Sequence, residues 1–141
     1  MRLNDILIQM VKVSENIKEA FDTQRIIPMA TVNKDGVPNV IYVAIWWWED
    51  DETICVVNNY LNKTLQNVTD TGLVSYVCYG KNGSFQIKCE AMNIAEGPLY
   101  EKGHKMATER EKPLPGKSTI VCKVVEVYQG SGGKGAGDKL A

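Results

Sequence analysis

Short clusters of turn-forming residues separate stretches of β-branched and aromatic residues along most of this chain. The clearest cluster is Asn33-Lys34-Asp35-Gly36, which stands between the apolar residues 26–32 and a strand-like stretch over residues 38–48. Glycine after Asp suits a type I turn with a left-handed bulge residue, so this cluster predicts a β-hairpin. Tight hairpins join antiparallel strands, which excludes the parallel sheet and the Rossmann cofactor site of a doubly wound fold.

Further hairpins follow the same pattern. The acidic run Glu49-Asp50-Asp51-Glu52 predicts a turn before a strand over residues 53–58. Gly80-Lys81-Asn82-Gly83 predicts another turn, between strands over residues 73–79 and 84–95. A last strand is expected over residues 118–128. The total of about six or seven strands predicts a mainly β fold, either a barrel or a sandwich.

Helical periodicity is limited to a few segments. Apolar residues at steps of three and four predict an amphipathic helix over residues 3–22. Asn62 suits the N-cap of a short helix over residues 62–71. Pro98 suits the first turn of a helix that extends to Arg110.

Length and charge narrow the class of protein. The 141 residues are expected to form one domain, residues 1–141, ending in a Gly-rich tail over residues 130–141. Sixteen basic and seventeen acidic residues give a net charge of −1, which argues against nucleic acid as a partner. Polar residues such as Asn4, Asp5 and Lys12 interrupt the N-terminal apolar residues, so neither a signal peptide nor a membrane span is expected. We therefore expect a cytoplasmic protein.

The four cysteines are predicted to be buried free thiols. Cys55, Cys78, Cys89 and Cys122 lie far apart, each within a predicted strand, and no CxxC pair is present. Metal-binding cysteines prefer close pairs, and disulfides need an oxidising compartment. We therefore expect no metal site.

Two further features have a structural and a functional interpretation. Strand alternation places Trp46 and Trp48 on one face and Trp47 on the other. Each face is interpreted either as part of the core or as part of a subunit interface, where Trp is enriched. His104 is the only histidine, and its polar neighbours predict a solvated surface residue. Without a GxSxG motif, a hydrolase triad around His104 is not supported.

The C-terminal glycines resemble a phosphate-binding loop only superficially. The run from Gly130 to Gly137 contains Lys134, but no Ser or Thr follows this lysine and too few residues remain for a helix. A flexible or docking tail is the preferred interpretation.

The segment that joins residues 53–58 to the short helix has the composition of an anion site. Asn58 and Asn59 end the strand, and Lys63 and Thr64 begin the helix, where backbone N–H groups lack partners within the helix. Lysine, hydroxyl and free N–H groups together bind a phosphate. From spacing alone, an ordinary capped surface helix is preferred, because Lys near a helix start is common.

Four segments in this order make the chain resemble a known family. They are residues 28–40, the turn Asp50-Asp51-Glu52-Thr53-Ile54, the block from Asn62 to Val68, and Phe85-Gln86-Ile87-Lys88. Together they resemble the pyridoxamine 5'-phosphate oxidase-related family of FMN-binding split-barrel proteins, over about residues 3–137. The resemblance implies a six-stranded antiparallel split barrel with an N-terminal helix and short helices, and a homodimer with FMN at its interface.

The resemblance also implies positions for the cofactor. Lys63 and Thr64 are expected to hold the FMN phosphate. Backbone and amide groups of two strands are expected to border the isoalloxazine ring, at Asn39, Val40 and Ile41 and at Val57, Asn58 and Asn59. Gln86 is expected to reach the flavin across the dimer.

Departures from the family limit the expected activity. The vitamin B6 oxidase has an Arg-rich C-terminal segment that binds substrate, whereas this chain has the Gly-rich tail, so it is not expected to be that oxidase. Cys89 stands where relatives often have Gly. We expect an FMN-dependent oxidoreductase or electron-transfer protein in which the flavin does the chemistry. The alternatives are a deazaflavin-dependent oxidoreductase of the same fold and a non-catalytic flavin-binding or sensing module. No catalytic residue and no electron donor or acceptor is predicted.

Overall fold

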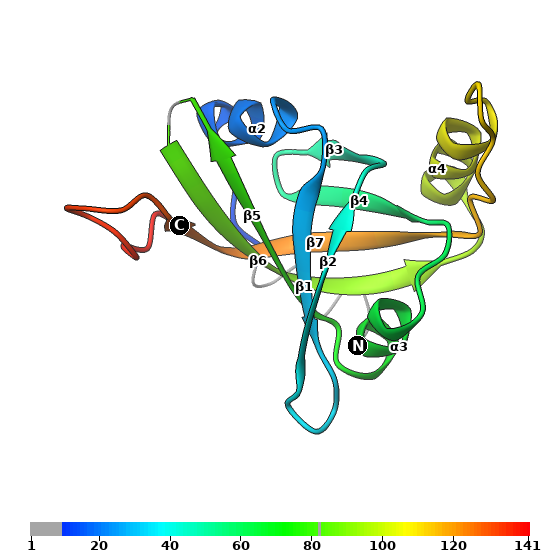
Figure 1. Ribbon diagram of the computed structural model, residues 1–141, viewed down its shortest axis with the longest axis horizontal. Coiled ribbons are helices and arrows are strands. Elements are labelled where there is room, and N and C mark those ends of the chain that lie inside the picture. Colours follow the sequence, from blue (N-terminus) through cyan, green and yellow to red (C-terminus); the bar gives the residue numbers. More distant parts are fainter. Residues whose placement is uncertain (1–9, 82) are drawn as a thin grey trace.

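The computed structural model describes residues 10–81 and 83–141 and contains a curled, seven-stranded antiparallel sheet (Figure 1). The strand order is β2-β1-β5-β6-β7-β4-β3. The strands are β1 (Ile27–Val32), β2 (Pro38–Val43), β3 (Trp46–Asp50), β4 (Thr53–Asn58), β5 (Leu73–Gly80), β6 (Gly83–Ile94) and β7 (Ser118–Gln129). The predicted mainly β barrel-like fold is confirmed, with seven strands in place of six.

The additional strand arises because the expected strand over residues 38–48 is divided in two. β2 pairs with β1, whereas β3 pairs with β4 at the opposite end of the strand order. The chain leaves one edge and joins the other at Ala44 and Ile45, where the carbonyl oxygen of Ile45 accepts a hydrogen bond from the Val57 amide at 3.0 Å. No glycine or proline marks this crossing, so the sequence pattern is continuous across it.

Three helices lie against the sheet in the described part of the chain: α2 (Glu15–Asp22), α3 (Lys63–Asp70) and α4 (Pro98–Thr108). In Figure 1, α3 lies beside the end of the sheet from which the β1–β2 hairpin projects, and α4 lies beyond β3 and β4. Within the residues described, no helix has the length and apolar character needed to cross a membrane.

Residues 10–14 of the predicted N-terminal helix are not helical. Residues 3–9 of the predicted helix lie outside the described residues, and the helix itself begins at Glu15. Before it, the Val11 amide donates to the Val124 carbonyl at 2.9 Å and the Val13 amide donates to the Asp51 carbonyl at 2.7 Å. At Val11 and Val13, tertiary hydrogen bonds therefore take the place of the helical bonds that the apolar periodicity predicts.

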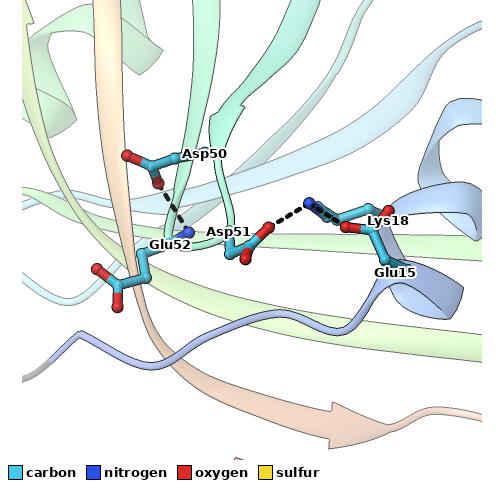
Figure 2. Close-up of polar contacts among 5 residues, drawn as sticks. All are labelled: Glu15, Lys18, Asp50, Asp51 and Glu52. Carbon is cyan, nitrogen blue, oxygen red and sulfur yellow. Dashed lines mark hydrogen bonds and ion pairs between the residues drawn. The ribbon is translucent and has the colours of Figure 1, made fainter.

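An ion pair fastens α2 to the turn between β3 and β4 (Figure 2). Lys18 lies 2.7 Å from Glu15 and 2.5 Å from Asp51, and its hydrogen bonds to these carboxylates raise its pKa to about 12. Asp50 accepts a hydrogen bond from the Glu52 amide at 2.8 Å, which closes the turn. In the acidic run, Asp50 therefore closes the predicted turn and Asp51 joins that turn to α2.

Two apolar clusters fill the two faces of the sheet. The larger one contains Phe21 of α2, which packs edge-on against Trp46 and Trp48 at centroid distances of 6.5 and 5.7 Å. The smaller one lies under α4 and contains Trp47. The predicted alternation of the tryptophans is confirmed, and all three pack within the chain.

The Gly-rich tail docks on β7. β4 pairs with β7 only as far as Lys123, which leaves the later edge of β7 open. The tail occupies it: Gln129 donates to Asp138 at 2.9 Å, and Val127 donates to Ala141 at 2.8 Å. The loop of this hairpin projects beyond the sheet in Figure 1. The docking interpretation of the tail is confirmed.

Candidate cofactor site

The site is built where α3 begins, beside β2. Thr64 is only 2% exposed, and its hydroxyl oxygen accepts a hydrogen bond from the Asn39 amide at 3.2 Å. Lys63 is exposed in the first turn of α3, and the first backbone bond of the helix is the one from Gln66 to Asn62. The Asn62 side chain makes no capping bond. Three predicted site residues, Asn39, Lys63 and Thr64, are thus brought together.

A polar hollow of about 550 Å³ lies between the β1–β2 hairpin and one side of α3, from Lys63 in the first turn to Asp70 at the end. Lys34, Asn39, Lys63, Gln66 and Asn67 are among the residues that line it. Both lysines can attract an anion and the amides can donate hydrogen bonds to it, and two carboxylates, Asp35 and Asp70, line the same hollow. Asn67 is itself fixed by a hydrogen bond to the Thr31 hydroxyl at 3.0 Å, so this wall of the hollow is held in place from β1.

Asn58 and Asn59 use their side chains inside the chain. The buried Asn58 amide donates to the Ser118 hydroxyl at 2.9 Å and its oxygen accepts from the Leu61 amide at 3.0 Å. The Asn59 oxygen accepts from the Gly116 amide at 2.9 Å. These bonds set the course of the backbone between β4 and α3, which leads directly to Lys63.

His104 differs from its expected role as a solvated residue. It is half-buried on α4, and its Nδ1 lies 2.8 Å from the Gly116 carbonyl oxygen. A carbonyl accepts, so this contact fixes the proton on Nδ1. Asn59 and His104 therefore hold the same residue, Gly116, through its N–H and its C=O. The sequence gives no sign of this pairing, because the partners are separated by a loop.

The other predicted ring neighbours have different environments. Val57 is buried under α4, and its amide is already bonded to Ile45. Ile41 is half-buried against the larger core, whereas Val40 points outward on the opposite side of β2. Only Val40 therefore presents its side chain to a partner or ligand outside the chain.

Val40 belongs to an exposed apolar face on three neighbouring strands. Ala30 pairs with Val40 on one side and with Ser75 on the other, so side chains at alternate positions of β2, β1 and β5 point the same way. Large exposed residues on this face are Val40, Tyr42, Leu73, Val77 and Tyr79, of which Tyr42 is 70% and Tyr79 is 83% exposed. Such a contiguous apolar face is typical of an interaction surface.

Gln86 lies on the same side of the sheet, next to this apolar face. It pairs with Val77 of β5 and Tyr128 of β7, and all three line a cavity of about 520 Å³. Lys88 lines the same cavity and lies 5.5 Å from the Tyr128 ring centroid. Sequence reasoning singled out Gln86 but not Lys88 or Tyr128. Strand alternation and register would have placed them beside it.

The cysteines lie in the core. All four are buried free thiols, as predicted. Burial raises the pKa of Cys89 well above its usual value and that of Cys122 to about 12. The Cys122 sulfur is 3.1 Å from the buried Tyr76 hydroxyl. Cys89 follows a β-bulge at Lys88 and turns into the core, so its thiol packs and does not act as a nucleophile.

Comparison with known proteins identifies the family. The family model described as pyridoxamine 5'-phosphate oxidase matches residues 13–130. The chain belongs to this family. The fold is similar to that of a solved FMN-binding protein from Syntrophomonas wolfei, which is 17% identical with a TM-score of 0.70, over 89% of this chain and 86% of that one. The split-barrel fold that the four sequence segments implied is therefore confirmed.

Two other proteins are similar over most of their length. HupZ of Group A Streptococcus has a TM-score of 0.76 and 23% identity, covering 89% of this chain and 99% of that chain. An uncharacterised protein of Methanocaldococcus jannaschii is 28% identical over 134 residues, which are 93% of this chain and 89% of that protein. The structural likeness shows the fold. The function is inferred from the residues of the site.

Proposed function

We propose that this protein is a homodimeric FMN-binding flavoprotein that passes electrons between a reduced carrier and a small acceptor. The observation that carries the proposal is the start of α3, where Lys63, which lines a polar hollow of about 550 Å³, lies next to the Thr64 hydroxyl and to helical N–H groups that no side chain caps. The choice of FMN is supported by the match to the pyridoxamine 5'-phosphate oxidase family model and by the fold shared with a protein named as FMN-binding.

The residues at the start of α3 fit a phosphate monoester. Asn39 donates to the Thr64 oxygen, which leaves the Thr64 hydroxyl proton free to be donated to a phosphate oxygen. The dipole of the eight-residue helix favours negative charge at the same end. Lys63 adds a full positive charge. Lys63, Thr64 and the N–H groups beside them would therefore hold the phosphate.

The exposed apolar face supports a homodimer. The side chains of Val40, Tyr42, Leu73, Val77 and Tyr79 form one surface that a second copy of the chain would cover. Val40 and Asn39 are neighbours on β2 whose side chains point to opposite faces, so a partner that covers the apolar face would lie across this edge strand from the residues that hold the phosphate. In this arrangement Gln86 reaches the flavin of the partner's site, and Asn39, Val40 and Ile41 border the ring from their own subunit. Val57, Asn58 and Asn59 hold the backbone beside it.

The bound FMN supplies the redox chemistry, and the protein binds it and excludes water. Asn58 and Asn59 contribute by fixing the backbone that leads to Lys63, since their amides are engaged with Ser118, Leu61 and Gly116. The Gly-rich tail offers no arginine that would bind the phosphate of a vitamin B6 substrate. We therefore propose a small electron acceptor and not that substrate.

Anaerobic reduction of the reconstituted protein tests this proposal. Protein loaded with FMN is mixed with NADH or NADPH, and the loss of the oxidised flavin spectrum is followed, with free FMN as the control. Reduction much faster than that of free FMN supports an oxidoreductase. Slow reduction by both carriers points to a flavin-binding or sensing module. Release of a deazaflavin on denaturing the purified protein, detected by mass spectrometry, would contradict the choice of cofactor.

A further inference from the structure

We propose that Lys88 is the cation that stabilises the reduced flavin in the partner subunit's site, and so sets the reduction potential. This inference rests on the proposed function, in which Gln86 reaches the flavin across the dimer. Lys88 ends one of the segments that carry the family resemblance, but the resemblance assigns it no role, and the inference follows from the register of β5, β6 and β7.

Register places Lys88 immediately beside Gln86 on the outward side of the sheet. Side chains two positions apart on a strand point to the same face. Gln86 pairs with Tyr128, and Lys88 pairs with Glu126 in the next row, so the four side chains form one patch. Lys88 lines both the cavity of Gln86 and a neighbouring cavity of about 520 Å³. A ring that contacts Gln86 therefore lies within reach of the Lys88 ammonium.

The charge of Lys88 remains available to a ligand. It forms no ion pair among the residues that the structure describes. The carboxylate across from it, Glu126, accepts a hydrogen bond from the Tyr128 hydroxyl. Lys139 and Glu90 also line the neighbouring cavity, so the group around Lys88 holds two lysines and two carboxylates. The Lys88 ammonium lies 5.5 Å from the Tyr128 ring centroid, and this cation–π contact holds it on this face of the sheet.

The charge of reduced FMN explains how a cation at Lys88 would affect the reduction potential. Two electrons and one proton convert the neutral ring into an anion whose negative charge lies on the pyrimidine side of the ring. Both electrons come from the reductant used, such as dithionite. A nearby ammonium stabilises this anion more than the neutral oxidised ring, because opposite charges attract strongly where water is excluded. Lys88 thus raises the potential without being needed to bind oxidised FMN.

The first test compares reduction potentials of FMN-loaded variants. Lys88→Met is expected to weaken binding of reduced FMN relative to oxidised FMN at least tenfold, which lowers the two-electron potential by about 30 mV. Lys88→Arg keeps the charge and should stay near the wild type, as should Lys105→Met, which removes an exposed lysine of α4. Dissociation constants for oxidised FMN are measured alongside and should change less than threefold. A potential that is the same in Lys88→Met and wild type would overturn the inference.

The second test asks whether Lys88 acts across the dimer. Lys63→Ala and Lys88→Met chains carrying different affinity tags are co-expressed, and the mixed dimer is isolated. One of its two sites combines an intact Lys63 with the intact Lys88 of the other chain. If Lys88 acts in trans, the bound FMN has the wild-type potential. If that FMN instead has the potential of the Lys88→Met homodimer, Lys88 acts within its own chain and the inference is wrong. Failure of wild-type protein to bind FMN at all refutes the proposed function separately.

Discussion

Replacing Lys63 with Met should weaken FMN binding and leave riboflavin binding unchanged. Lys63 is exposed in the first turn of α3, beside the buried Thr64. A charge-assisted hydrogen bond contributes about 1.5–3 kcal/mol, and the lower part of this range applies because Lys63 is open to water. A loss of about 1.5–2 kcal/mol corresponds to a rise in the FMN dissociation constant of about 10- to 30-fold.

The comparison with riboflavin makes this prediction specific. Riboflavin lacks the phosphate but has the same ring, so a phosphate contact affects FMN alone. Titrations that follow flavin fluorescence give both dissociation constants for wild type, Lys63→Met and the control Lys105→Met. Equal weakening of FMN and riboflavin would show that Lys63 supports the fold of the site. An unchanged FMN constant would place the phosphate elsewhere, and either result refutes the reasoning.

Other predictions concern the dimer and the packing of the chain. Tyr42→Glu puts a charge on the apolar face, so light scattering should show monomers where wild type is dimeric; an undiminished mass would argue for another interface. A Cβ on Gly103 would lie 2.6 Å from the Thr119 hydroxyl, so Gly103→Ala should cost about 1–2 kcal/mol in urea unfolding, and adding Thr119→Ala should restore part of it; no rescue would mean the clash lies elsewhere. Lys18 lowers the pKa of Asp51, so the pair stabilises the fold above about pH 4 and this contribution disappears as the pH falls. The stability difference between wild type and Lys18→Met should therefore shrink in acid, and a difference that persists at pH 2 would contradict the pairing.

Local signals in the sequence predicted most strands and turns. The cluster at Asn33 to Gly36 and the acidic turn before β4 both lie where they were expected. These features depend on a few neighbouring residues, such as a glycine with a positive φ of 83° at Gly36. The fold therefore follows from short-range rules wherever hairpins connect the strands.

Features that depend on distant partners were missed. Helix α2 begins at Glu15, and the amides of Val11 and Val13 before it bond to β7 and to the β3–β4 turn. The periodicity of apolar residues contains no information about such long-range bonds. The break between β2 and β3 at Ala44 and Ile45 likewise has no marker in the local sequence, because the chain crosses there from one edge of the curled sheet to the other.

The candidate site was predictable in part. Composition suggested an anion at Lys63 and Thr64, and the family resemblance turned this into an FMN phosphate. The contact of Thr64 with Asn39 supports that grouping, since it joins β2 to α3 across 25 positions of sequence. The structure alone shows that Asn59 and His104 both hold Gly116, and that Lys88 and Tyr128 share the surroundings of Gln86.

The central claim is that this chain binds FMN through its phosphate, with one site per chain in a dimer. The most direct measurement is a titration of the purified protein with FMN, followed by its visible spectrum, with the mass of the complex measured by light scattering. The account predicts saturation at one FMN per chain in a dimeric, yellow protein that binds FMN more tightly than riboflavin. Protein that stays colourless with excess FMN, or that binds both flavins equally, would contradict it.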